Sequence, residues 1–148
     1  MMIDVKMIDI TGKEVSTRTA IACGRIKLKP ETISKILKGE IEKGDVISTA
    51  KISAIMAAKK TSYIIPLCHQ IPITNVNVDV KVVDERTIEV ETMVKTEAKT
   101  GVEMEALTST AIALITIWDM VKKYEKNEDG GYPETKIENI EVKLKLKE

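Results

Sequence analysis

The sequence predicts an α+β protein in which helices pack on one face of an antiparallel sheet. Two stretches alternate apolar and polar residues as half-buried strands do: Val76 to Val94, with a turn in its middle, and Lys136 to Lys147. Between them, the stretch from Gly101 to Lys126 is apolar around most of its middle, which is typical of a helix buried on several sides, either in the core or against a neighbouring subunit. Strands and helices grouped in this way favour an α+β architecture.

The first part of the chain predicts one strand and then two helices. Residues 17–28 alternate between two faces, with Gly24 as a candidate bulge. Pro30 stands where a helix can begin, and Gly39 ends the apolar stripe that follows it. Asp45 is a suitable N-cap for the second helix. The whole order, strand, helix, helix, strand, strand, helix, strand, is nearest to the ferredoxin-like topology.

The composition describes one folded domain, which we expect to span residues 1–148. Hydrophobic residues make up 43% of the chain and charged residues 31%, which is not the balance of a disordered protein. The 23 basic and 23 acidic side chains balance, and aromatic residues reach only 3%, so we expect no nucleic-acid partner. The sequence shows no signal-peptide pattern and no uninterrupted apolar run of membrane-spanning length. We therefore expect no membrane partner and a cytoplasmic location.

Cys23 and Cys68 stand alone, without the paired spacing of a redox or metal motif. This use of cysteine fits a reducing compartment. Together with a single histidine, the two thiols cannot supply the four ligands of a structural zinc site. We therefore expect no such metal site, and we expect no cofactor.

His69 is the only histidine of the chain, and it follows Cys68 in a connection that Pro66 begins. An imidazole titrates near pH 6.5, which suits a proton shuttle or an oxyanion donor at neutral pH. A loop histidine satisfied by backbone groups is the alternative, and the residue pattern leaves both interpretations open.

Asp119 and Lys122 lie about one turn apart on the long predicted helix, at the edge of its apolar stretch. Such a pair is tuned for acid–base chemistry when it is buried, and it is an ordinary surface pair when it is not. Glu105 lies on the same side of the helix 14 residues earlier, about 21 Å away at 1.5 Å per residue. No small substrate spans that distance. Either one end of the helix is catalytic, or the two ends serve sites formed between copies; the apolar middle favours the second arrangement.

Several cations are candidates for binding phosphate. Lys43 precedes a glycine at the start of a predicted helix, and Arg18 falls on one face of the first strand. The remaining members of this cationic set are Lys13, Lys51, Lys59 and Lys60. Because lysine is abundant in this chain, a solvated surface charge is the common alternative for each. The sequence contains neither a Walker A loop nor a dinucleotide-binding fingerprint.

Six stretches, taken in chain order, match the pattern of one known family. They are MIDITGK (7–13), TRTA (17–20), KGDVISTAKI (43–52), MAAKKTS (56–62), IPLCH (65–69) and KTGVEMEALTSTAIALITIWDMVK (99–122). Together they resemble the cyclic pyranopterin monophosphate synthase family of molybdenum cofactor biosynthesis. The resemblance implies a lyase that converts a cyclised dihydroguanosine triphosphate into cyclic pyranopterin monophosphate and releases pyrophosphate. It also implies a ferredoxin-like fold and a homohexamer, built as a trimer of dimers with sites at the dimer interfaces.

Carried over residue by residue, the resemblance implies a set of site residues. The catalytic ones are Asp119, Lys43, Lys122 and His69. The substrate-binding ones are Leu67, Cys68, His69, Met104, Glu105 and Arg18. In this scheme Lys43 and Lys122 exchange protons with the substrate, Asp119 tunes Lys122, and Arg18 stabilises the departing pyrophosphate. The alternative is a non-catalytic domain of the same fold that binds a nucleotide or pterin, and the presence of both lysines and the aspartate favours the enzyme.

Overall fold

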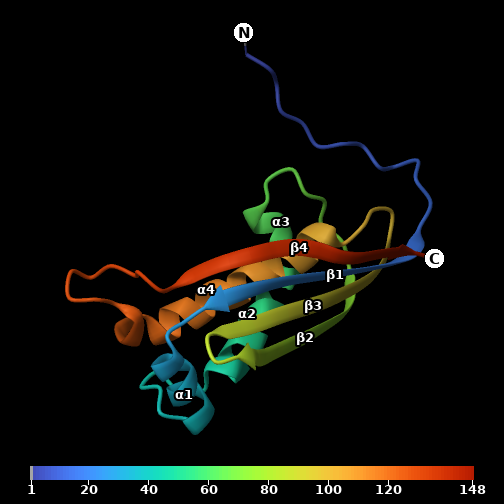
Figure 1. The fold of residues 1–148 in the computed structure, drawn as a ribbon. Coiled ribbons are helices and arrows are strands. Elements are labelled where there is room, and N and C mark those ends of the chain that lie inside the picture. Colours follow the sequence, from blue (N-terminus) through green and yellow to red (C-terminus); the bar gives the residue numbers. More distant parts are fainter. Residues whose placement is uncertain (1) are drawn as a thin grey trace.

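The computed structural model describes residues 2–148 as a four-stranded antiparallel sheet with helices on one face (Figure 1). The elements in chain order are β1 (Ser16–Lys27), α1 (Pro30–Lys38), α2 (Val46–Lys59), α3 (Thr61–Ile64), β2 (Ile73–Asp84), β3 (Thr87–Ala98), α4 (Glu103–Glu125) and β4 (Lys136–Lys147). The strand order across the sheet is β2-β3-β1-β4, which is the ferredoxin-like order. The predicted fold class and the predicted order of the main elements are therefore confirmed.

The signals that begin and end the helices act as the sequence indicates. Pro30 occupies the first turn of α1, where its missing N–H removes no hydrogen bond. Gly39 ends α1 in the left-handed conformation, with φ of 69°. The side chain of Asp45 accepts a hydrogen bond of 2.8 Å from the backbone N–H of Ser48, so the predicted N-cap of α2 is confirmed. The short helix α3 was not predicted from the sequence.

Gly24 of β1 allows α4 to pack close against the sheet. A Cβ atom at this position would lie 2.8 Å from Cδ1 of Leu114 and 2.9 Å from Cγ1 of Ile140. The pairing of β1 with β4 shifts register between Cys23 and Arg25, which confirms the predicted bulge. Gly24 thus interrupts the regular pairing of β1 with β4, and its missing side chain also leaves space for α4.

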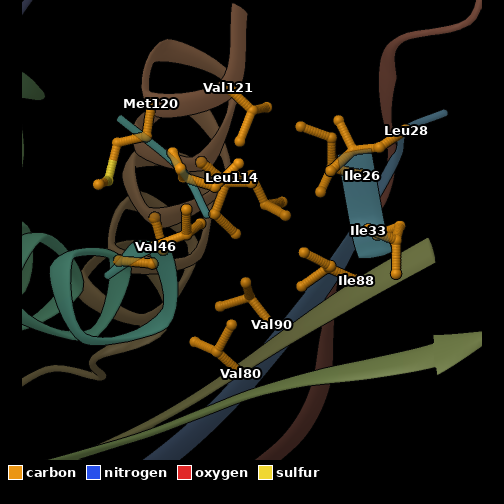
Figure 2. Close-up of a cluster of buried hydrophobic side chains, with 14 of the residues drawn as sticks. Ile26, Leu28, Ile33, Val46, Val80, Ile88, Val90, Leu114, Met120 and Val121 are labelled. Carbon is orange, nitrogen blue, oxygen red and sulfur yellow. The ribbon is translucent and has the colours of Figure 1, made fainter. Parts of the chain in front are cut away.

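The main core lies between α4, α2 and the covered face of the sheet (Figure 2). Val80, Ile88 and Val90 rise from β2 and β3 toward Leu114 of α4, and Val46 of α2 closes one side. All five side chains are buried, which removes them from water and provides much of the driving force for folding. The apolar residues of the predicted hairpin therefore face the core, as the alternating pattern indicates.

The helix α4 is buried along one side and exposed along the other. Ala106, Ala113 and Ile117 are fully buried, whereas 41% of Met104 and 53% of Ile115 are exposed. Among residues 2–148, α4 is the one helix whose length and hydropathy would allow it to cross a membrane, and half of its most apolar window is buried inside the fold. A core helix of this kind passes the same test, so the hydropathy reflects packing against the sheet and α2.

Candidate active site

Lys43, Asp119 and Lys122 form a compact ionic cluster near the C-terminal end of α4. Lys43 comes from the loop between α1 and α2, and the other two residues lie about one turn apart on α4. The Nζ atom of Lys43 lies 3.0 Å from Oδ2 of Asp119 and 3.2 Å from its backbone oxygen. The Nζ atom of Lys122 lies 3.2 Å from Oδ1 of the same carboxylate. Each oxygen of the aspartate is thus paired with a different lysine.

The two lysines set the protonation of Asp119. Hydrogen bonds from Lys43 and then Lys122 hold the pKa of the Asp119 carboxyl below its ordinary value. The sequence places this residue at the edge of a buried stretch, but 55% of its side chain is exposed. Desolvation therefore has little influence, and the carboxylate remains charged beside two ammonium groups at neutral pH. In a single copy of the chain the cluster is open to solvent and to a ligand.

Two cavities flank Asp119. One of about 300 Å³ has a largely apolar wall that includes Ile115 and Trp118. The other, of about 260 Å³, lies between α4 and the loop that carries Lys43, and Tyr124 contributes to its lining. A planar apolar group and an anionic group would therefore find suitable surfaces on the two sides of one carboxylate–lysine cluster.

A second cluster lies at the opposite end of α4. Leu67, Cys68, His69 and Met104 line one cavity of about 320 Å³. Glu105 lies next to it: its side chain is only 3% exposed, and its Oε2 accepts a hydrogen bond of 3.8 Å from Sγ of Cys68. The other carboxylate oxygen, Oε1, has no hydrogen-bond partner within residues 2–148. A buried polar atom without a partner is uncommon in a folded protein and marks a group with a specific role.

Burial governs the ionisation of this second cluster. It raises the pKa of the Glu105 carboxyl above its ordinary value, because the charged form loses water. Burial also raises the pKa of the Cys68 thiol, and the nearby Glu105 charge adds to the effect. The thiol therefore stays protonated at neutral pH and acts as a hydrogen-bond donor, since the thiolate is the form that attacks as a nucleophile.

The segment before β1 lies against the second cluster. Nε2 of His69 contacts the backbone oxygen of Ile8, and Nζ of Lys99 donates a hydrogen bond of 2.8 Å to the backbone oxygen of Thr11. Arg18 is buried on the helix-facing side of β1, where its Nη2 donates to the backbone oxygen of Lys99 at 3.3 Å. Its Nε has no partner within the described chain. Arg18 is thus placed beside the cavity of the second cluster through Lys99 and not beside Asp119.

The structure therefore brings the sequence-predicted residues together in two groups and not in one. Asp119, Lys43 and Lys122 form the first group, and the others lie at the second cluster. Glu105 and Asp119 are 14 residues apart on one continuous helix, which corresponds to about 21 Å. Lys51, Lys59 and Lys60 are exposed on or next to α2, and Lys13 is exposed before β1. Within residues 2–148, no group of three His, Cys, Asp or Glu side chains is arranged to hold a metal ion.

Sequence reasoning missed the residues that hold the loop of Lys43. The backbone N–H of Glu42 donates a hydrogen bond of 2.9 Å to the hydroxyl oxygen of Tyr124, and Lys123 pairs with the Glu42 carboxylate. The partners are more than 80 positions apart in the chain, so no local spacing connects them. The one sequence signal that could have indicated such contacts is the run of polar residues directly after Lys122, at the end of the predicted helix.

The fold is ferredoxin-like, and its long helix carries a lysine–carboxylate cluster at one end and a histidine–thiol–carboxylate cluster at the other. These two clusters contain the acid and base groups that an enzyme needs. A sequence profile of the MoaC family matches residues 7–147, and the chain belongs to that family.

Three relatives are named "Probable cyclic pyranopterin monophosphate synthase". The protein from Sulfolobus acidocaldarius is 57% identical over 141 residues, which cover 95% of this chain and 98% of the relative. The protein from Saccharolobus solfataricus is 56% identical over 148 residues, covering 100% and 99% of the two chains. The protein from Pyrococcus furiosus is 56% identical over 144 residues, covering 97% and 92%.

Proposed function

We propose that this chain is a cyclic pyranopterin monophosphate synthase of molybdenum cofactor biosynthesis. It converts a cyclised dihydroguanosine triphosphate into cyclic pyranopterin monophosphate and releases pyrophosphate. The single observation that carries the proposal is the pairing of both Asp119 oxygens with lysines, because opening and reclosing rings requires groups that give and take protons. The names of the full-length relatives support the same reaction.

The ionic cluster supplies the proton transfers in this proposal. Lys43 and Lys122 act as general acid and base, and the Asp119 carboxylate holds both ammonium groups in place. His69 contributes an imidazole, which can donate or accept a hydrogen bond. Arg18 stabilises the pyrophosphate as its negative charge develops, since a guanidinium binds phosphate oxygens through two parallel hydrogen bonds.

The second cluster binds the substrate. Leu67, Cys68, His69 and Met104 line its cavity, and Glu105 offers an unpartnered carboxylate oxygen to a donor on the substrate ring. A protonated Cys68 thiol holds the other oxygen of that carboxylate. The substrate is thereby fixed through hydrogen bonds while the lysines act on it.

We propose that each active site combines the two clusters from different copies of the chain. They lie about 21 Å apart on one helix, which is too far for one small substrate. Exposed Met104 and Ile115 lie on the open side of α4 and are available for contact with a second copy. A two-fold contact between two α4 helices would bring the Asp119 end of one against the Glu105 end of the other. The assembly proposed is a homohexamer, a trimer of such dimers.

The remaining parts of the proposal concern the chain as a whole. Residues 1–148 form one domain that acts in the cytoplasm on a small molecule, as a lyase. Nucleic acid and membranes are not partners, in keeping with the balanced charge of the chain.

The test is product formation from the cyclised dihydroguanosine triphosphate, followed by mass spectrometry together with pyrophosphate release. Wild type is expected to convert the substrate, and Lys43→Ala is expected to lose conversion. Lys81→Ala is the matched control, because Lys81 pairs with Asp79 on the sheet face opposite the helices. Tight substrate binding by an assembled wild type without conversion would contradict the proposal and support the non-catalytic alternative.

A further inference from the structure

The loop between α1 and α2 carries Lys43 and has a glycine with positive φ near each end. Gly39 has φ of 69° and Gly44 has φ of 113°. Glycine populates such conformations at little cost and leaves several paths open to the chain. Of the intervening residues, Ile41 is buried and anchors the first half of the loop, whereas Glu42 and Lys43 are exposed. Packing alone therefore does not fix the backbone at the residue that meets Asp119.

The last turns of α4 hold this exposed half of the loop. The backbone N–H of Glu42 donates a hydrogen bond of 2.9 Å to the hydroxyl oxygen of Tyr124. The Tyr124 ring is half-buried, and the ammonium groups of Lys35 and Lys123 lie 5.6 Å and 5.4 Å from its centroid. These two cation–π contacts restrict the ring. The phenol hydroxyl is therefore a fixed acceptor for the backbone one residue before Lys43.

The neighbouring ion pair is a weaker restraint. Lys123 pairs with the Glu42 carboxylate, but 61% and 69% of these side chains are exposed. Exposed ion pairs contribute little to stability and are screened by salt. The Tyr124 hydroxyl is uncharged and acts on the backbone itself, so its effect persists at physiological ionic strength.

We propose that Tyr124 is a positioning residue for Lys43: its hydroxyl fixes the backbone at Glu42, so that the next side chain reaches the Asp119 carboxylate. Tyr124 lies five residues beyond Asp119 on α4, about 7.5 Å along the helix axis. One residue step of about 3.8 Å and the lysine stem cover that distance. The role in catalysis rests on the proposed function, whereas the positioning of Lys43 does not.

The test compares Tyr124→Phe with wild type in kcat and KM for product formation. The variant loses only the hydroxyl, and we expect kcat to fall about tenfold, the equivalent of one lost hydrogen bond, with little change in KM. Tyr132→Phe is the control, because the Tyr132 ring packs edge-on against Trp118 and its hydroxyl makes no hydrogen bond within residues 2–148. An unchanged kcat in Tyr124→Phe, or a fall of the same size in Tyr132→Phe, would overturn the inference.

A second readout does not depend on activity. The pKa of Asp119, followed by NMR of its carboxyl carbon, is lowered by Lys43 in wild type and should rise in Lys43→Ala. It should rise in Tyr124→Phe as well, and not in Tyr132→Phe. An Asp119 pKa that Tyr124→Phe leaves unchanged would refute the inference even in an active enzyme. If wild type converts no substrate, the proposed function fails and this measurement still decides the positioning role.

Hydrogen exchange in the wild-type protein covers the case in which Tyr124→Phe does not fold. The Glu42 amide donates to Tyr124 and is expected to exchange slowly, despite its exposed position in the loop. Exchange of the Glu42 amide as fast as that of an unstructured peptide would also overturn the inference.

Discussion

Lys43 and Asp119 are 76 positions apart in the chain, and the Nζ atom of the one lies 3.0 Å from Oδ2 of the other. The exposed position of the pair means that it adds little to folding stability. The Asp119 carboxylate holds the ammonium group of Lys43 close to that of a second lysine, Lys122. A site organised in this way can lose its chemistry while the fold remains intact.

The first prediction concerns the charge of Asp119. Asp119→Asn keeps the size of the side chain but no longer balances two ammonium groups, so we expect kcat to fall by about 10²–10⁴, the usual contribution of a general acid–base group. The melting temperature should stay within about 2 °C of wild type, because exposed residues contribute little. Asp79→Asn, which removes a carboxylate paired with Lys81, is the control. An Asp119→Asn enzyme with the wild-type kcat would remove the cluster from the mechanism.

A second prediction follows from the burial of Glu105, which raises the pKa of its carboxyl above the ordinary 4.5. A group with a raised pKa in the fold stabilises the protein most when it is protonated, below pH 4.5. That contribution is lost as the pH rises through the raised value. The Gln side chain of Glu105→Gln is neutral at every pH, so this variant does not lose stability as the pH rises. The melting temperature of Glu105→Gln minus that of wild type should therefore increase by a few degrees between about pH 4 and pH 7.5.

Thermal unfolding of wild type and Glu105→Gln at several pH values measures this difference. Glu134→Gln is the control, because that carboxylate is exposed and pairs with Arg86. A difference between wild type and Glu105→Gln that stays constant with pH would show that burial does not govern the ionisation of Glu105.

The third prediction concerns the close approach of α4 to β1. Gly24→Ala places a Cβ 2.8 Å from Cδ1 of Leu114, so one of the two must move. We expect a loss of about 1–3 kcal/mol in the free energy of unfolding, the usual cost of overpacking a core. Gly12→Ala is the control, since nothing lies within 4 Å of the added atom. Denaturant unfolding measures both, and a Gly24→Ala protein as stable as wild type would mean that the helix shifts freely.

The fourth prediction concerns Glu125, which is fully buried at the end of α4. Its carboxylate accepts hydrogen bonds from the backbone N–H of Lys29 at 3.1 Å and from the hydroxyls of Thr32 and Thr135. These bonds join α4 to the start of α1 and to the segment before β4. Glu125→Gln replaces one acceptor oxygen by a donor that faces other donors, so unfolding free energy should fall by about 3 kcal/mol.

The control for this prediction is Glu128→Gln, the same change at an exposed position in the turn that follows α4. It should stay within about 0.5 kcal/mol of wild type in chemical denaturation. Equal stability of the two variants would show that the buried hydrogen bonds are replaced without cost.

The sequence predicts most of the fold because its periodic patterns extend over whole elements. The alternating valines of β2 and the alternating tail of β4 each identify a strand without reference to the rest of the chain. The helix α3 has only four residues, which are too few to show a periodic pattern, so the sequence does not predict it. It begins at Thr61, whose hydroxyl donates hydrogen bonds to the backbone oxygens of Ala57 and Ala58.

The site is less accessible to sequence reasoning because its contacts join distant parts of the chain. Spacing along α4 identifies Asp119 with Lys122, whereas Lys43 is grouped with them in the sequence only through the family resemblance, and the fold shows the contact. Of the two interpretations left open for Asp119 and Lys122, the structure shows the exposed ion pair, because Asp119 faces away from the core although its neighbours in sequence are apolar. Glu125 was missed, although it falls four residues after buried Val121, and a charged residue on a buried helix face needs partners.

The central claim is that two clusters on one helix serve two different copies of the chain. It is tested most directly by mixing two inactive variants, Asp119→Asn and His69→Ala, each altered in one cluster. Both are assayed for product formation before and after they are refolded together, so that mixed oligomers form. Random mixing in equal amounts makes about a quarter of the sites wild type in both clusters, so about a quarter of the wild-type activity should return. A mixture that stays as inactive as its components would show that both clusters act within one copy.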